Sequence, residues 1–201
     1  MADTAAPRKN LSRAALIALA AVFFAPLLGA TFLYYWNDSL PLPGSAAHGE
    51  LIHPARPIEQ LALVNRSGEP LDENFLRGRW TLVYLGSERC DLYCEASLFK
   101  MRQVRLSLGR DLGRVQRLFV QTASANLSDL DEILARHPRM MVASPREPAG
   151  SPLLGVFGDE SIEAVYLVDP LGNLMMRYGS DATSKGMLKD LKRLLKNSRI
   201  G

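Results

Sequence analysis

The pattern of apolar and polar positions divides the 201-residue chain into an uncharged N-terminal run and a mixed remainder. From Ala14 to Trp36 no charged residue occurs. At 1.5 Å per residue, this stretch is long enough to cross a hydrocarbon core about 30 Å thick. It ends in aromatic residues of the kind found at membrane interfaces: Phe32, Tyr34, Tyr35 and Trp36. We predict a transmembrane anchor over residues 14–36; the alternative is a cleaved signal peptide, whose apolar region is usually shorter.

The charges that flank this anchor predict its orientation. Arg8, Lys9 and Arg13 precede it, whereas the next basic residue after it is Arg56. By the positive-inside rule, residues 1–13 are cytoplasmic and the rest of the chain lies outside. In a bacterium this corresponds to a single pass through the inner membrane, with a periplasmic C-terminal domain in an oxidising compartment.

Residues 37–57 are rich in proline and glycine, a composition that favours extended or irregular backbone. We predict a linker here, followed by one folded domain over residues 58–201. The linker contains His48 and His53. We interpret both as solvated residues and not as metal ligands, because two mobile imidazoles make a poorly organised metal site.

The domain alternates predicted strands and helices. Short apolar or β-branched runs bounded by turn residues predict strands at residues 61–65, 80–85, 118–122, 140–143, 164–168 and 174–178. Apolar positions at helical spacing predict helices over residues 94–108, 128–137 and 182–198. Ser128 is the expected cap of the second helix. The last two strands should be antiparallel, and the pattern predicts no conformation for residues 144–158. This order indicates an α/β fold.

Composition and charge limit the function classes. With 47% hydrophobic and 22% charged residues, the chain fits one globular domain plus an appendage. The net charge is +3, of which the first 13 residues supply +2, so nothing indicates nucleic-acid binding. A denser basic set is either a solvated helix face or a docking surface for an acidic partner or anionic headgroups. Its members are Lys100, Arg102, Arg105, Arg110, Arg114 and Arg117.

The candidate chemistry lies at the only two cysteines, Cys90 and Cys94, which follow the predicted strand at residues 80–85. Residues four apart share one face of a helix, and the first helical turn favours thiolate over thiol. Arg89 adds to this effect, whereas three acidic neighbours oppose it: Glu88, Asp91 and Glu95. We predict that Cys90 and Cys94 act as catalytic thiols or as metal ligands.

A purely structural disulfide is the plainer alternative for this pair. A bridge that closes so few residues removes little unfolded-state entropy, well under the roughly 3 kcal/mol of a 15-residue loop. This favours a redox or metal role. His137, which precedes Pro138 at a predicted helix end, is interpreted as a helix-capping residue and not as a ligand.

Several of these features together resemble the thioredoxin fold. They are a strand that ends in an aromatic residue and glycine, a cysteine pair at the first helix, a βαβ unit, a Tyr-Leu-Val-Asp-Pro-x-Gly hairpin and a final amphipathic helix. The C-x3-C spacing behind a single anchor is similar to the Sco/SenC family, the copper-binding assembly factors of cytochrome c oxidase. The resemblance covers residues 61–195 and implies that Cys90 and Cys94 are copper-binding thiols. It implies copper as the metal, and the copper-bearing oxidase subunit or other assembly factors as partners.

The chain also departs from this family pattern. The family has a histidine a few residues before the hairpin tyrosine, here Tyr166, whereas residues 158–163 contain none. The prolines usual within and after the cysteine motif are also missing. Two soft thiolates suit Cu(I), but Cu(II) prefers additional nitrogen or oxygen donors, so we expect weak or no Cu(II) binding. The nearby residues that offer a substitute ligand are Asp159, Glu160, Glu163, Met175 and Met176.

Two hypotheses of different classes follow from the sequence. The first is an assembly factor that hands Cu(I) to the copper site of an oxidase subunit, or keeps the thiols of that site reduced. The second is an enzyme, a general periplasmic thiol-disulfide oxidoreductase. A non-catalytic scaffold that only uses the thioredoxin-like fold is a third reading.

Overall fold

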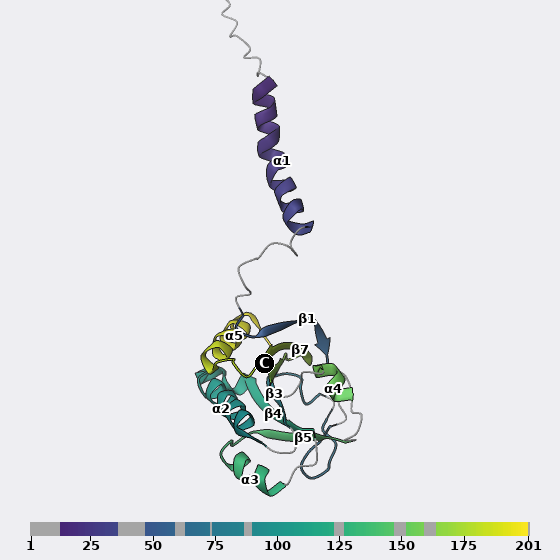
Figure 1. The fold of residues 1–201 in the computed structure, drawn as a ribbon, viewed down its shortest axis with the longest axis vertical. Helices are drawn as coiled ribbons and strands as arrows, with labels where there is room; N and C mark the ends of the chain where they lie inside the picture. Colours follow the sequence, from purple (N-terminus) through teal and green to yellow (C-terminus); the bar gives the residue numbers. More distant parts are fainter. Residues whose placement is uncertain are drawn as a thin grey trace, which may run out of the picture. The chain divides into compact units, whose positions relative to one another are not determined.

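The computed structural model describes eight stretches of the chain: residues 13–35, 47–58, 63–72, 74–86, 90–122, 127–146, 152–158 and 164–200. The chain divides into two compact units, of which the second begins at Ala47. The first contains helix α1 (Arg13–Tyr35), whose bounds lie within one residue of the predicted anchor (Figure 1). Among the described residues, α1 alone is long and apolar enough to cross a membrane. Trp36 lies outside the described residues.

The second unit is built on one mixed sheet. Its described strands follow the order β1-β7-β6-β3-β4-β5-β2. Strands β3, β4 and β5 are parallel neighbours, and the other neighbouring pairs are antiparallel. The bounds are β1 (Glu50–Pro57), β2 (Leu63–Val64), β3 (Trp80–Gly86), β4 (Val115–Gln121), β5 (Met141–Pro145), β6 (Val165–Val168) and β7 (Asn173–Tyr178).

Helices cover both faces of this sheet. Helices α2 (Leu92–Leu106) and α5 (Ser184–Asn197) lie side by side on one face, and α4 (Pro152–Phe157) lies on the other side of the sheet (Figure 1). Helix α3 (Leu127–Ala135) contributes to the core of the α2 and α5 face, and the 3₁₀ helix η2 (Gly109–Arg114) connects α2 to β4.

Alternation along β3 divides the core into two layers. Leu82 and Tyr84 belong to the apolar cluster under α2 and α5, whereas Val83 and Leu85 belong to the cluster on the other face. Successive side chains of a strand point to opposite faces, so a strand buried on both faces reads as a continuous apolar run. This explains why residues 80–85 gave the clearest strand pattern.

Most predicted elements correspond to observed ones. Strands β3 to β7 and helices α2, α3 and α5 occur where the sequence predicts them, and β6 and β7 are antiparallel as expected. The predicted cap is wrong, because α3 begins at Leu127 and Ser128 is already its second residue. The span without a predicted conformation, residues 144–158, holds the end of β5 and the whole of α4.

The predicted linker is wrong from Ala47 onward. Residues 47–57 belong to the folded unit, and β1 pairs with β7 at the edge of the sheet. Proline is tolerated in an edge strand, whose outer N–H groups need no partner, and at a bulge. Pro54 satisfies both conditions, since the register of β1 shifts between Leu51 and Arg56. The proline content that indicated a linker is therefore compatible with an edge strand.

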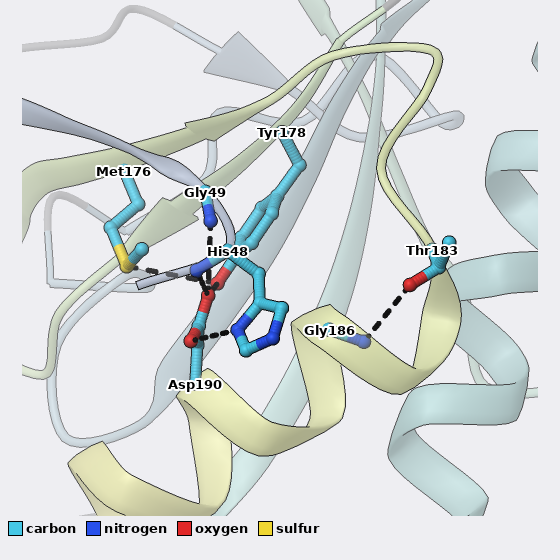
Figure 2. A network of polar contacts seen from close by, with 7 residues as sticks. All are labelled: His48, Gly49, Met176, Tyr178, Thr183, Gly186 and Asp190. Atoms are coloured by element: carbon cyan, nitrogen blue, oxygen red, sulfur yellow. Dashed lines mark hydrogen bonds and ion pairs between the residues drawn. The ribbon is translucent and has the colours of Figure 1, made fainter. Parts of the chain in front are cut away.

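A buried carboxylate fastens this N-terminal segment to helix α5 (Figure 2). Asp190, only 4% exposed, accepts hydrogen bonds through Oδ2 from the backbone N–H groups of His48 (2.8 Å) and Gly49 (3.0 Å) and from the Tyr178 hydroxyl (3.4 Å). Its Oδ1 lies 3.1 Å from His48 Nδ1. His48 is thus bound to the folded unit, although its side chain stays 42% exposed. Burial, reinforced by Asp190, raises the pKa of Tyr178 far above its usual range, which keeps the hydroxyl a donor.

The carboxyl end of β3 is fixed by close packing. A Cβ atom at Gly86 would lie 2.3 Å from Cζ and 2.6 Å from Cε2 of Phe119, whose ring stacks on Tyr84 with centroids 6.0 Å apart. The Gly86 carbonyl also accepts hydrogen bonds from the N–H (2.9 Å) and hydroxyl (2.8 Å) of Thr122. Any larger residue at position 86 would require the Phe119 ring to shift.

We expect Asp190→Ala to lower the free energy of unfolding by about 2 to 3 kcal/mol, because it leaves three donors without their buried acceptor. Chemical denaturation of the full chain in detergent micelles measures this loss, and faster hydrogen exchange at the His48 and Gly49 amides localises it. Lys192→Ala, an exposed position on the same helix, is the matched control and should change stability by less than about 0.5 kcal/mol. Equal stability of the two variants contradicts the role given to Asp190.

We expect Gly86→Ala to destabilise the domain by about 1 to 3 kcal/mol through overpacking against Phe119. Phe119→Leu removes the ring atoms that the new methyl group meets. In the double variant the two losses should therefore be less than additive, by at least about 0.5 kcal/mol. Equilibrium unfolding of both single variants and the double variant gives this coupling, and strict additivity would show that the contact does not restrict residue 86.

Candidate functional site

Strand β3 directly precedes the segment that contains the cysteine pair. All seven of its residues are buried, and it lies between β4 and β6 near the middle of the sheet. Cys90 follows its carboxyl end and Cys94 lies in the first turn of α2. Residues 87–89 in between, which include the predicted charges Glu88 and Arg89, lie outside the described residues.

Asp91 starts helix α2 and so positions both cysteines. Its extended backbone (φ −79°, ψ −171°) and its side chain make it the N-cap, because Oδ1 accepts the backbone N–H groups of Tyr93 (3.1 Å) and Cys94 (3.0 Å). Cys90 therefore precedes the cap. The prediction that both cysteines share one face of a helix is wrong, since only Cys94 belongs to the helix.

Cys90 and Cys94 are joined by a disulfide, with their Cα atoms 5.0 Å apart. Cys94 is 2% exposed and packs in the core with Tyr84 and Leu98, whereas Cys90 is half-buried at the edge of the same cluster. The expectation of an exposed pair is therefore wrong for Cys94 and only partly met by Cys90. The two sulfurs differ in access, which lets an incoming reactant meet Cys90 first.

Two of the three acidic neighbours of the pair, Asp91 and Glu95, are already engaged by other groups. Asp91 caps the helix, and Glu95 Oε1 lies 3.3 Å from Nη2 of Arg136, which follows α3. Sequence reasoning missed the capping role and counted Asp91 only as an opposing charge. The available signal was an aspartate directly before a helical apolar pattern, which is a common N-cap arrangement.

None of the three histidines in the chain lies beside the pair. His53 is in β1 and His48 is bound to Asp190, both at an edge three strands away from β3, a lateral distance of about 14 Å. His137 precedes β5 at the amino ends of the parallel strands, whereas the cysteines follow the carboxyl end of β3. His137 is also not the predicted helix cap, because its ring is buried and Nδ1 has no partner among the described residues.

The two methionines suggested as substitute ligands lie in β7, away from the cysteine pair. Met176 pairs in register with Leu167, which pairs with Leu82, so it lies four residues back from Gly86 along the sheet. Its sulfur lies 3.6 Å from the Tyr178 hydroxyl oxygen, and neighbouring Met175 packs against the core. The acidic candidates Asp159, Glu160 and Glu163 lie outside the described residues.

The donor set can be tested against copper, the metal that the family resemblance implies. Within the described residues, no group of three or more His, Cys, Asp or Glu side chains is arranged to hold a metal ion. The disulfide must first be reduced, since thiolates are the ligands. Two thiolates then match Cu(I), which is soft, whereas none of the three histidines adds a nitrogen donor for Cu(II). The donors among the described residues fit Cu(I).

Comparisons with known proteins identify the fold of the domain as thioredoxin-like. A family model described as "Transmembrane-like, thioredoxin-like, C-terminal domain" matches residues 80–198, more than half of the chain. No curated protein sequence matches the chain.

Solved structures of Sco proteins share the fold at low sequence identity. Apo Sco1 of Thermus thermophilus has 19% identity and a TM-score of 0.62, covering 76% of this chain and 99% of its own. Copper-bound yeast Sco1 has 23% identity and a TM-score of 0.56, covering 77% and 96%. BsSco, described as a cytochrome c oxidase assembly protein with a disulfide switch, has 15% identity and a TM-score of 0.56, covering 72% and 96%. The chain therefore belongs to the thioredoxin-like family whose model it matches, and its fold is Sco/SenC-like.

Proposed function

We propose that this protein is a membrane-anchored assembly factor of the Sco/SenC kind, whose Cys90–Cys94 pair serves the maturation of a cytochrome c oxidase copper site. The observation that carries the proposal is the joining of the two cysteines at the carboxyl end of β3 and the start of α2 in a Sco-like fold. The described relatives supply the class of function, since yeast Sco1 binds copper and BsSco is an oxidase assembly protein with a disulfide switch.

The unequal access of the two sulfurs defines an order for thiol exchange. In the reduced pair, the Cys90 thiolate attacks a disulfide of the target, forms a mixed disulfide and releases one target thiolate, which takes up a proton. The Cys94 thiolate then attacks Cys90 Sγ, releases the second target thiol and closes the Cys90–Cys94 disulfide. Two electrons and two protons pass to the target, and a dithiol donor must reduce the pair again.

Copper handling uses the same two sulfurs in their reduced form. Two thiolates bind Cu(I) with low coordination, which leaves the ion open to a third ligand from a target protein. Copper is cargo in this scheme and not a resident cofactor. The partner is the copper-bearing oxidase subunit, or another assembly factor that passes Cu(I) on.

Helix α1 places this chemistry at a membrane surface in the proposal. Residues 14–36 anchor the chain in the bacterial inner membrane with residues 1–13 in the cytoplasm, on the charge asymmetry of the flanks. The thioredoxin-like domain then lies in the periplasm. There an oxidising environment makes reduction of thiols a necessary step before copper can bind.

We expect the reduced full chain in detergent to bind one Cu(I) and to bind Cu(II) weakly. Cys90→Ser and Cys94→Ser should each weaken Cu(I) binding by at least roughly 10- to 100-fold. This is the effect of losing a residue that only supports a metal ligand, and each cysteine is a ligand itself. Competition with a Cu(I) chelator measures this affinity. His53→Gln, an exposed imidazole in β1, is the control and should bind as the unaltered chain does. Tight Cu(II) binding with a sulfur-to-copper charge-transfer band contradicts the two-thiolate site.

We expect Cys94→Ser to trap mixed disulfides through Cys90, and Cys90→Ser to trap few, because Cys94 is 2% exposed. Non-reducing electrophoresis of membranes, followed by mass spectrometry, identifies the trapped proteins. A copper-bearing oxidase subunit supports the assembly role, whereas many unrelated proteins favour the general oxidoreductase. If neither variant traps a protein, thiol exchange is excluded. Binding of Cu(I) would then indicate an assembly factor, and absence of Cu(I) binding would indicate a non-catalytic scaffold.

A further inference from the structure

A basic pocket lies at the carboxyl end of α2, away from the cysteines. Its volume is about 210 Å³, and four of its seven lining residues are arginines while none is acidic. The lining residues are Arg102, Arg105, Leu106, Leu112, Arg117, Pro138 and Arg139. They come from α2, η2, β4 and the segment between α3 and β5, so distant parts of the chain converge on it.

Arg117 makes this pocket unusual. It is 2% exposed, and its Nη2 donates to the carbonyl of Pro138 at 2.6 Å. Its Nε and Nη1 are buried without a hydrogen-bond partner among the described residues. Buried donors of a charged group are nearly always paired, because leaving them unpaired costs the full desolvation energy. Arg117 therefore lines the pocket with a guanidinium group that has two buried donors without an acceptor among the described residues.

No carboxylate among the described residues neutralises the four arginines of the pocket. Among the described residues, the recorded ion pairs with carboxylates include none of Arg102, Arg105, Arg117 and Arg139. Arg105 donates through Nε to the neutral carbonyl of Val115 at 2.7 Å. Burial, and then the charges of Arg105 and Arg102, lower the pKa of Arg117 to about 10. The cluster is a concentrated positive field that an anion would relieve.

We propose that this pocket binds a phosphate-class oxyanion. Guanidinium groups present planar sets of donors that match the oxygens of phosphate, and several converging arginines suit a multiply charged anion better than a single carboxylate. The volume is below the roughly 300 to 1,000 Å³ of drug-sized ligand sites, which points to a small group. Leu106, Leu112 and Pro138 supply apolar walls that strengthen each charge interaction. The phosphate is either free or part of a lipid headgroup.

This site is separate from the proposed redox and copper chemistry. Arg102 follows Cys94 by eight residues along α2, about 12 Å at the rise of a helix. The pocket lining contains neither cysteine, so its test can fail without affecting the proposed function.

His137 provides a spectroscopic reporter for the pocket. Its ring is buried with Nδ1 unpartnered, and its pKa is lowered by burial and then by Arg117, Arg102 and Arg136, while Glu95 acts in the opposite direction. An anion that neutralises Arg117 and Arg102 removes part of this repulsion. The pKa of His137 must therefore rise toward its ordinary value of about 6.5 when the pocket is occupied.

The experiment is a titration of the full chain with inorganic phosphate in maltoside micelles, which carry no phosphate, at constant ionic strength set with chloride. NMR of the histidine rings follows the pKa of His137 and gives the dissociation constant. Arg139→Ala, at an exposed position, and Arg117→Met should each weaken binding by about tenfold or more, the effect of losing one charge-assisted hydrogen bond. Arg110→Ala, an exposed arginine outside the pocket lining, is the matched control.

A saturable rise in the pKa of His137 that Arg139→Ala weakens and Arg110→Ala does not supports the proposal, with free phosphate as the source. A second arm replaces inorganic phosphate by phosphatidylglycerol in the micelles, against an uncharged glycolipid. A response in this arm alone supports the pocket with a lipid headgroup as the source. No response in either arm, or equal weakening in Arg110→Ala and Arg139→Ala, overturns the proposal.

Discussion

The burial of β3 on both faces and both edges is the constraint from which the rest of the domain follows. Its side chains alternate between the two apolar clusters, while β4 and β6 satisfy its backbone on either side. Such a strand cannot shift by one residue, since that would exchange its two faces. The end of β3 at Gly86 is therefore fixed in space, and with it the start of the segment that carries the cysteines. The position of the thiols is set by the core and not by local loop chemistry.

Asp190 extends this control to the N-terminal edge of the domain. The segment from Ala47 to Gly49 is held by a carboxylate whose oxygens accept hydrogen bonds from two backbone N–H groups and a tyrosine hydroxyl. A buried carboxylate is costly unless its hydrogen bonds are complete, so the arrangement favours one conformation strongly over partly bonded ones. The edge strand β1 begins directly after this point of attachment, which gives its pairing with β7 a defined start.

The sequence predicted the fold and the place of the cysteine pair after a buried strand because both depend on local patterns. Buried strands and the amphipathic helix α5 give periodic signals, and a lone cysteine pair after a strand is visible in any reading. The exact geometry at Cys90 was less accessible, since it turns on Asp91 acting as a cap one residue after it. The attachment of His48 to Asp190 joins residues 142 positions apart and leaves no local signal. The prolines around it even argued against a strand.

The arginine pocket is a second feature that the sequence alone could not determine. The sequence identified a basic set that includes Arg102, Arg105 and Arg117 but could not tell a solvated helix face from a binding site. What decides between these readings is burial and convergence. Arg117 sits in β4, and the parallel pairing of β4 with β5 brings the segment of Arg139 beside it. A surface arginine gains little from one more anion, whereas a buried one with open donors gains much.

Helix α2 links the two candidate sites while keeping them electrostatically apart. Its amino end, with positive dipole character, faces the cysteine pair and favours thiolate, and its carboxyl end favours the cations Arg102 and Arg105. The separation of about 12 Å between the cysteine pair and the pocket is larger than the Debye length, which is about 8 Å at physiological salt. An anion in the pocket should therefore change the thiols little through its field. Coupling between the sites requires a movement of α2 itself, which its packing against β3, β4 and α5 opposes.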